Sequence, residues 1–339
     1  RGLDALNDQL RYISHYPDAT NDDVLNAIAD TYGMDKNQII VGNGAAELLY
    51  AICRLPGYTG AFVPAPGFSE YKEALEASNI PVRDIFYRPR EDDNGKPYFE
   101  VPYLALETFA AELKGQDGRI IVFLGNPNNP DGTLLDKAHI RTVASMLKDA
   151  NSLLVIDESF IDFVGNEPLR DNDQSMRSLI NEFDNIIIVH SFTKFYAVPG
   201  LRIGAAFGNE KLISQLHQYI PSWSVNTLAQ AYTEAALNDV NYIKRTKQEL
   251  NEERAFMYNA LDAIEGITVY PPSANFMLFK VNHEGITANT INENLKRDNM
   301  IVRNCDSYVG LNNQWVRIAI KDHDTNIKLV EKLTDILKV

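Results

Sequence analysis

The sequence predicts an α/β fold with a mostly parallel central sheet, followed by a smaller α+β region. Three observations predict it: short apolar runs without polar alternation, helical stretches between these runs, and a change to longer helical segments after about Asn226. Buried parallel strands carry such continuous apolar runs, and each parallel pair needs a crossover connection, usually a helix. With 339 residues and 45% apolar content, the chain can bury a large core.

The expected elements divide the chain into two domains. Alternating strands and helices predict a large, cofactor-binding domain over residues 20–226, with strands near 39–42, 60–64, 82–87, 119–124, 152–157, 186–191 and 202–207. An inter-domain helix and a small domain are expected from residues 1–19 and 227–339. The small domain should contain short strands and a closing helix, at 267–270, 275–281, 300–303, 315–320 and about 324–337.

Composition excludes several classes of partner. A net charge of −14 argues against nucleic acid and against an anionic membrane, since both require a basic surface. No apolar stretch approaches the roughly 20 residues that span a bilayer, and no signal-peptide pattern opens the sequence. Two cysteines are too few for a disulfide framework, which fits a reducing cytoplasm. The six histidines are scattered without ligand spacing, so we predict no metal site.

Lys194 lies in the segment S-F-T-K-F-Y-A-V-P-G-L-R-I-G, between the hydroxyls of Ser191 and Thr193 and the guanidinium of Arg202. A lysine amine condenses with an aldehyde only when deprotonated, and burial near other cations lowers its pKa. The segment therefore suits a Schiff-base lysine beside a phosphate site, with pyridoxal 5′-phosphate as the aldehyde. A solvated loop lysine is the alternative.

Asp157 ends the apolar run 152–156, which is typical of a buried parallel strand. Ligands of open α/β sheets bind beyond the carboxyl ends of the strands, where this carboxylate should lie. Opposite a pyridine nitrogen it would keep that nitrogen protonated and make the ring an electron sink. The alternative is an aspartate that caps a turn or helix.

Two turns follow expected strands directly. The first, V-G-N-G-A-A-E-L-L (41–49), passes through Gly42 and Gly44 into an apolar helix, where small residues let backbone amides approach an anion. The second, F-L-G-N-P-N-N-P-D-G (123–132), contains Asn129, which could donate to a phenolate-like ring oxygen. Chain reversal alone is the alternative for both turns.

In order and spacing, these segments resemble the fold-type-I pyridoxal-phosphate enzymes, the aspartate aminotransferase superfamily, along essentially the whole chain. The resemblance implies that Lys194 forms the Schiff base, that Asp157 pairs with the pyridine nitrogen, and that Asn129 meets the ring hydroxyl. It also implies a homodimer with shared active sites, in which Tyr16 of H-Y-P-D reaches the phosphate of the neighbouring subunit. Phe68 would stack on the ring, and the phosphate would be bound by Gly44, Ala45, Ala46, Ser191, Thr193 and Arg202.

Two arginines on the late strands are the expected substrate ligands. On the last strand Val316 and Ile318 face one way, so Arg317 faces the other; a solvated edge arginine is the alternative. By the resemblance, Arg317 binds the substrate carboxylate or shares a phosphate, with Asn129 nearby. Arg303 would then contact a substrate phosphate through two parallel charge-assisted bonds.

Within the superfamily, the sequence is most similar to threonine-phosphate decarboxylases of the corrinoid pathway and to histidinol-phosphate aminotransferases. Segments that favour the decarboxylases are 157–163, 193–202, 223–226 and 303–305. Phe160 stands where these aminotransferases usually carry a tyrosine that bonds the ring oxygen, so its presence should raise the imine pKa; a plain core aromatic is the alternative. Asp131 replaces a usual threonine, and the sequence begins at Arg1 without the Asn-Pro-containing segment that relatives place over the active site.

The resemblance therefore implies a cytoplasmic lyase that uses pyridoxal 5′-phosphate to decarboxylate L-threonine O-3-phosphate to aminopropanol O-2-phosphate in cobalamin biosynthesis. Its partner would be a small phosphorylated amino acid. The nearer alternative is a histidinol-phosphate or related amino-acid aminotransferase. The more distant alternative is a non-catalytic module that binds the cofactor.

Overall fold

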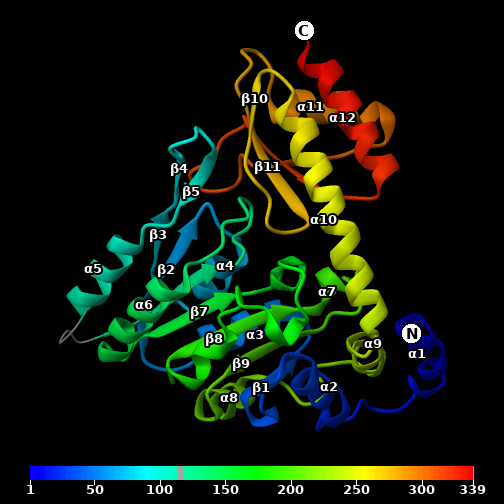
Figure 1. Ribbon diagram of the computed structural model, residues 1–339. Helices are drawn as coiled ribbons and strands as arrows, with labels where there is room; N and C mark the ends of the chain where they lie inside the picture. The colour runs from blue at the N-terminus through cyan, green and yellow to red at the C-terminus, as the bar shows by residue number, and fades with distance from the viewer. Residues whose placement is uncertain (114–117, 339) are drawn as a thin grey trace.

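A seven-stranded sheet forms the centre of the larger part of the molecule (Figure 1), in a computed structural model that describes residues 1–113 and 118–338. Its strand order is β1-β9-β8-β7-β6-β2-β3. Strands β3, β2, β6, β7 and β8 run parallel, whereas β9 is antiparallel to both β8 and β1. The predicted α/β class with a mostly parallel sheet is confirmed. The strands are β1 (Ile39–Gly42), β2 (Tyr58–Ala65), β3 (Val82–Phe86), β6 (Arg119–Gly125), β7 (Leu153–Asp157), β8 (Ile186–Ser191) and β9 (Gly204–Gly208).

Both faces of this sheet are buried. On β8, Ile186 and Ile188 join one apolar core and Ile187 and Val189 join another, because successive side chains point to opposite faces. Helices pack on each face, so the larger part has three layers. The first core contains residues of α2 (Asp22–Tyr32), α5 (Tyr103–Leu113), α6 (Lys137–Asp149) and α9 (Thr227–Leu237), and the second those of α3 (Gly44–Cys53), α4 (Glu70–Ala77) and α8 (Glu210–Leu216).

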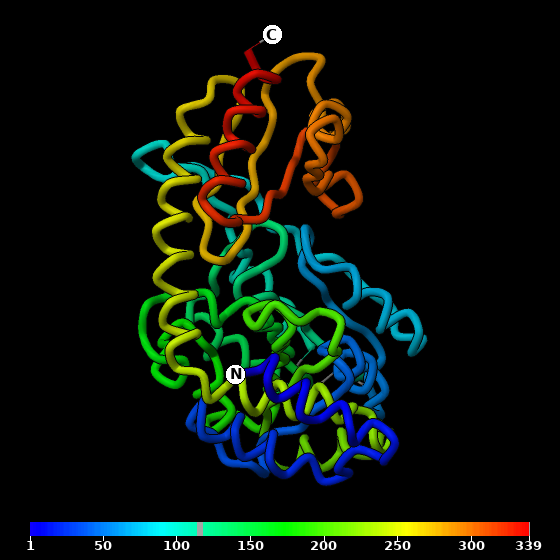
Figure 2. Tube along the Cα trace, turned by 90° about the vertical axis from the view of Figure 1, so that its right-hand side faces the viewer, coloured from blue at the N-terminus to red at the C-terminus, as the bar shows by residue number. Residues whose placement is uncertain are grey.

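The smaller part is a four-stranded antiparallel sheet, ordered β10-β11-β13-β12, with a core of its own. The long helix α10 (Val240–Asp262) connects it to α9, as Figures 1 and 2 show. Val316 and Ile318 point into the core of the smaller part, whereas Trp315 joins a core of the larger part, which confirms the predicted orientation of this strand. The elements are β10 (Ile267–Val269), β11 (Phe276–Val281), β12 (Arg303–Asn304), β13 (Trp315–Ala319), α11 (Ala288–Leu295) and α12 (His323–Leu337).

A hairpin of β4 (Arg88–Glu91) and β5 (Pro97–Glu100) was not predicted from the sequence. All side chains of β4 are exposed, so this strand lacks the apolar alternation that reveals a half-buried strand. The hairpin nevertheless links the two parts of the molecule. The ring of Phe99 lies 5.0 Å from that of Tyr270 and 5.5 Å from that of Trp315.

Two predicted strands begin later than expected, for backbone reasons. Strand β9 begins at Gly204 because Arg202 has a φ of +61°, which is incompatible with an extended strand. Strand β12 covers only Arg303 and Asn304: a short 3₁₀ helix (Lys296–Asp298) ends at Asn299, and the backbone amide and carbonyl of Val302 bond to the side chain of Asn292.

The N-terminal helix α1 (Gly2–Gln9) packs against α9 and not against the four-stranded sheet (Figure 1). A Cβ on Gly2 would lie only 2.5 Å from Cε2 of Tyr232, so glycine allows this close approach. The division of the chain into a large domain (20–226) and a small domain (1–19 and 227–339) stays a prediction. Within the described residues, no helix is both long and apolar enough to cross a membrane.

Candidate active site

The carboxyl ends of the parallel strands meet at one edge of the sheet. Asp157 at the end of β7 pairs with Gly125 of β6, and Ser191 at the end of β8 pairs with Gly204 of β9. Gly204 also pairs with Gly42 at the end of β1, so three neighbouring strands reach the same level. Ligands of open α/β sheets bind beyond this edge.

A cavity at this edge brings together most of the predicted cofactor residues, although they come from distant segments. Gly44 lies directly beside it under Arg202, and Tyr16 lies elsewhere on the surface. Predicted residues that line the cavity are Ala45, Ala46, Phe68, Asn129, Asp157, Ser191, Thr193, Lys194 and Arg202. Lining residues that the sequence did not single out are Glu70, Tyr71, Pro127 and Ser159.

One corner of the cavity has the chemistry of a phosphate site. The hydroxyls of Ser191 and Thr193 lie 2.8 Å apart, opposite the first turn of α3, whose backbone amides are free to bind an anion. A Cβ on Gly204 would lie 2.6 Å from the amide nitrogen of Ala45, and one on Gly44 would lie 2.5 Å from Nη2 of Arg202. The two glycines therefore let the helix and the guanidinium approach the same point.

Arg202 reaches this corner from a left-handed backbone conformation, with a φ of +61°. Such a conformation costs a residue with a side chain about 1–3 kcal/mol and persists where the surroundings impose it. Its Nη1 donates to the carbonyl of Pro199 at 3.3 Å, which leaves the rest of the guanidinium facing the cavity. The strained arginine therefore presents N–H donors to the cavity, where an anion could bind.

Asp157 is buried, with 7% of its surface exposed, and both of its carboxylate oxygens accept a hydrogen bond. Oδ1 accepts from the backbone amide of Ser159 at 2.9 Å, and Oδ2 accepts from the hydroxyl of Tyr71 at 2.8 Å. Tyr71 was not recognisable as a site residue from the sequence, because its partner is 86 positions away in the chain.

Lys194 projects from the four-residue helix α7 (Phe192–Phe195) into the cavity. Burial lowers the pKa of its amine; Asp157 opposes this shift, and Arg202 and Arg317 add to it. Its Nζ lies 5.8 Å from the ring centre of Phe160. A lysine with a lowered pKa is a better nucleophile toward an aldehyde near neutral pH. The predicted Schiff-base role of Lys194 stays a prediction.

An outer cavity continues from the inner one and contains both predicted substrate arginines. Nη1 of Arg317 donates to Oδ1 of Asn129 and, at 3.3 Å, to the hydroxyl of Tyr308. Tyr308 itself donates to Oδ1 of Asn129 at 3.1 Å. Arg303 donates to the hydroxyl of Ser307 at 2.9 Å. Tyr308 and Ser307 were missed, since only the fold brings their loop to this cavity.

The two residues that depart from the family pattern occupy different positions. Phe160 lines both cavities and packs edge-on against Phe276 at 5.0 Å. Asp131 is buried behind the Asn-Pro turn, where it accepts from the side chain of Asn128 and, at 2.8 Å, from the amide of Thr133. Burial raises the pKa of Asp131. Asp131 therefore fastens the turn that carries Asn129.

Tyr16 is 80% exposed and lies against Trp223, with the ring centres 4.8 Å apart. It is not among the residues that line the inner or the outer cavity of its own chain. Its predicted contact with the cofactor of a second subunit stays a prediction.

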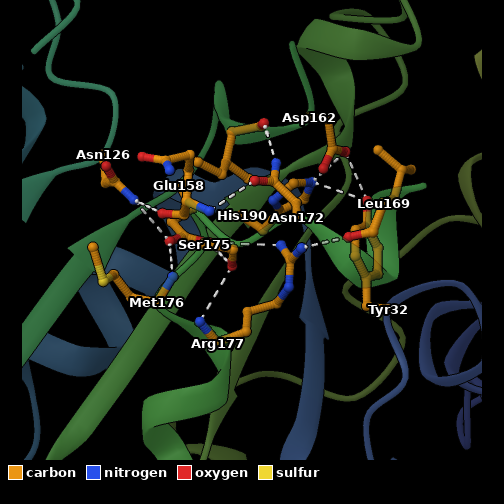
Figure 3. A network of polar contacts seen from close by, with 12 residues as sticks. Tyr32, Asn126, Glu158, Asp162, Leu169, Asn172, Ser175, Met176, Arg177 and His190 are labelled. Carbon is orange, nitrogen blue, oxygen red and sulfur yellow. Dashed lines mark hydrogen bonds and ion pairs between the residues drawn. The ribbon is translucent and has the colours of Figure 1, made fainter. Parts of the chain in front are cut away.

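A buried polar network includes residues next to the ends of β7 and β8 (Figure 3). Glu158, next to Asp157, accepts from Asn126 at 3.0 Å and from the hydroxyl of Ser175 at 2.6 Å, and lies 3.6 Å from Arg177. The surrounding buried contacts fix the segment that follows β7. The network thereby restrains the backbone on which Asp157 is carried.

The second half of the network lies beside Ser191. Asp162 accepts from Tyr32 at 2.7 Å and from His190 at 3.1 Å. Burial alone would raise the pKa of Asp162, but His190 and Arg177 lower it below its ordinary value. Since His190 precedes Ser191 on β8, this half restrains the start of the Lys194 segment.

These features fit pyridoxal 5′-phosphate. A reactive amine, a buried carboxylate and a phosphate corner converge on one cavity, and glycines stand where a Cβ would close that corner. Among the residues described, no three His, Cys, Asp or Glu side chains cluster so as to bind a metal ion.

Comparison with known proteins agrees with this geometry. Residues 4–333 match the family model described as aminotransferase class I and II. The chain belongs to this family. Its members bind pyridoxal 5′-phosphate, so the protein is a pyridoxal-phosphate-dependent enzyme of the aminotransferase family, with the fold-type-I architecture.

Individual relatives carry two different names. The chain is 31% identical to the threonine-phosphate decarboxylase of Salmonella typhimurium, over 98% of this chain and 86% of that protein. It is 30% identical to the histidinol-phosphate aminotransferase of Methanothermobacter thermautotrophicus, over 99% of this chain and 85% of that protein. The crystal structure of the histidinol-phosphate aminotransferase from Clostridium acetobutylicum superposes on this chain with a TM-score of 0.87 at 25% identity. The superposition covers 99% of this chain and 95% of that chain.

One further relative is much longer than this chain. An adenosylcobalamin biosynthesis bifunctional protein of Leptospira interrogans is 30% identical over 98% of this chain, which spans 36% of that protein.

Proposed function

We propose that the protein decarboxylates L-threonine O-3-phosphate to aminopropanol O-2-phosphate, as a lyase of corrinoid (cobalamin) biosynthesis. The observation that carries the proposal is the pair of arginines in the outer cavity. Arg303 and Arg317 lie directly opposite each other on β12 and β13. Like charges in this position destabilise a sheet, which favours a dianionic ligand that neutralises both. A phosphorylated amino acid carries the two required anions.

The cofactor, when bound, withdraws electrons from the Cα of the amino acid that is joined to it. We assign its covalent attachment to Lys194 and its ring nitrogen to Asp157. Asn129 would bind the ring hydroxyl, and Phe68 would cover the ring face. The phosphate would be bound by Gly44, Ala45, Ala46, Ser191, Thr193 and Arg202, all at or beside the inner cavity.

A homodimer with shared active sites is part of the proposal. The exposed rings of Tyr16 and Trp223 lie together on the surface, where a second subunit could cover them. Tyr16 would then contact the cofactor phosphate of the other subunit. We also propose the domain division at residue 227, which keeps α1 and α9 in one unit, with α9 packed against the core of the larger part.

Decarboxylation breaks the bond from Cα to the carboxylate carbon, releases carbon dioxide and adds one proton at Cα. We assign the substrate phosphate to Arg303 and the carboxylate to Arg317, whose guanidinium is fixed by Asn129 and Tyr308. This restraint would set the direction of the bond that breaks. The amine of Lys194 has a lowered pKa and faces the same cavity, so it can move the proton to Cα.

Transamination by a histidinol-phosphate or related amino-acid aminotransferase is the second candidate, because relatives with that name match the chain equally well. Phe160 favours the decarboxylase, since this group of aminotransferases usually has a tyrosine there. A non-catalytic binding module is less consistent, because Lys194, Asp157, Arg202 and Arg317 all face the cavities.

Mass spectrometry of the products separates these candidates. The holoprotein would be incubated with L-threonine O-3-phosphate, with and without an added 2-oxo acid, beside Lys194→Ala as the inactive control. Decarboxylation predicts a product lighter by carbon dioxide in both samples. A product that has lost its amino group, and that forms only when the 2-oxo acid is present, would replace the proposal with transamination.

A further inference from the structure

Tyr71 is a buried tyrosine of α4 that contacts two walls of the inner cavity. Its hydroxyl donates to Oδ2 of Asp157 at 2.8 Å. Its ring stacks on Phe123, with centres 5.2 Å apart and planes 12° apart, and meets Phe68 edge-on at 5.6 Å. One side chain therefore connects the carboxylate assigned to the ring nitrogen with the aromatic residue assigned to the ring face.

We propose that Tyr71 is a positioning residue that orients the Asp157 carboxylate toward the cofactor and donates a hydrogen bond to it. This inference rests on the proposed role of Asp157 opposite the ring nitrogen. The amide of Ser159 donates to Oδ1 and Tyr71 donates to Oδ2, so both oxygens are fixed and the carboxylate cannot rotate freely. Each oxygen keeps a second lone pair for another donor.

Tyr71 can act in this way throughout the working pH range. Burial and the Asp157 carboxylate raise the pKa of the Tyr71 phenol well above its ordinary value, so it remains a donor. A donor to a carboxylate stabilises its negative charge. A charged carboxylate opposite the ring nitrogen would keep that nitrogen protonated and the ring electron-poor.

Packing alone does not explain the hydroxyl, because phenylalanine would make the same ring contacts. Burial of a hydroxyl is unfavourable unless it is hydrogen-bonded. Tyr87 provides a comparison within the same protein: it is equally buried, at 3% exposure, but its hydroxyl has no hydrogen-bond partner among the described residues. Tyr87→Phe is therefore a matched control that removes a buried hydroxyl without removing a bond to Asp157.

The test follows the visible absorbance of the bound cofactor as a function of pH. The holoprotein would be compared with Tyr71→Phe, Tyr87→Phe, Asp157→Asn and the double variant of Tyr71 and Asp157. Tyr71→Phe should raise the midpoint of the absorbance change by up to roughly one to two pH units, the scale of one lost hydrogen bond to a charged group. Tyr87→Phe should leave the midpoint unchanged, and the double variant should match Asp157→Asn.

If Tyr71→Phe still shifted the midpoint in the Asp157→Asn background, Tyr71 would act through packing and the inference would be wrong. An unchanged midpoint in the single variant Tyr71→Phe would also overturn the inference. If Asp157→Asn itself had no effect, the proposed role of Asp157 would fail first. 3-Fluorotyrosine at position 71 keeps the ring and the hydroxyl, and it should shift the midpoint in the direction opposite to Tyr71→Phe. The more acidic phenol is a stronger donor, so the midpoint should fall, and a rise would contradict the proposal.

Discussion

Replacing Arg303 by alanine should remove the preference for a phosphorylated substrate. In the structure its guanidinium lies at the outer cavity and, within residues 1–113 and 118–338, donates only to Ser307, at 2.9 Å, so further N–H groups remain for a phosphate. A hydrogen bond to a charged group contributes about 1.5–3 kcal/mol. Arg303 is exposed at the rim, so solvent screening reduces the effect of two such bonds. We therefore expect a loss of about 3 kcal/mol, or roughly two orders of magnitude in kcat/KM.

The assay is the initial rate of decarboxylation with threonine phosphate and with threonine. Arg303→Ala should lower kcat/KM for threonine phosphate and leave the slow reaction of threonine nearly unchanged, because threonine cannot use the phosphate contact. Arg303→Lys should recover part of the loss, since lysine keeps the charge but not the planar fork. Arg297→Ala is the matched control, because Arg297 is an exposed arginine of the same region outside both cavities.

Equal losses on both substrates would refute this reasoning. Arg303 would then bind the carboxylate or support the pocket, and the phosphate site would lie elsewhere. A preference for threonine phosphate that survives in Arg303→Ala would have the same consequence.

Three further outcomes are expected. Gly204→Ala should lower the free energy of unfolding in urea by about 1–3 kcal/mol and weaken cofactor binding, since its Cβ would meet backbone atoms. Gly208→Ala on the same strand should lower that free energy less, because its Cβ would have its nearest contact at 3.4 Å. Arg177→Met should cost about 3–5 kcal/mol in urea unfolding, because it leaves the buried Glu158 without its cation; an unchanged midpoint would show that this pair contributes little. Tyr16→Phe should weaken cofactor binding without changing the urea midpoint, and a fully active monomer in sedimentation would contradict the shared site.

The sequence was informative where local patterns determine structure. Continuous apolar runs located the central strands, because a buried parallel strand cannot alternate with polar residues. Asp157 and Ser191 stand at the ends of such runs, so their common edge followed from the parallel arrangement. The convergence of Ser191, Thr193 and the start of α3 on one cavity was predictable for the same reason, since small residues and hydroxyls follow strand ends directly.

Tertiary contacts were beyond the reach of these patterns. Tyr71 and Tyr308 are ordinary aromatic residues in the sequence and gain their roles from partners far along the chain. The β4–β5 hairpin is exposed along β4 and was missed, although Asp92 to Gly95 form a turn that could have indicated it. The late start of β9 depends on the left-handed conformation of Arg202, which no propensity predicts.

The fate of the carboxylate carbon tests the central claim most directly. L-Threonine O-3-phosphate labelled with carbon-13 in its carboxylate would be incubated with the holoprotein in D₂O and followed by NMR. The proposed reaction predicts that the label leaves as carbon dioxide, and that the aminopropanol phosphate product retains its amino group and carries one deuterium at Cα. Label that stays in the organic product, while the amino group passes to an added 2-oxo acid, would contradict decarboxylation and identify a transaminase.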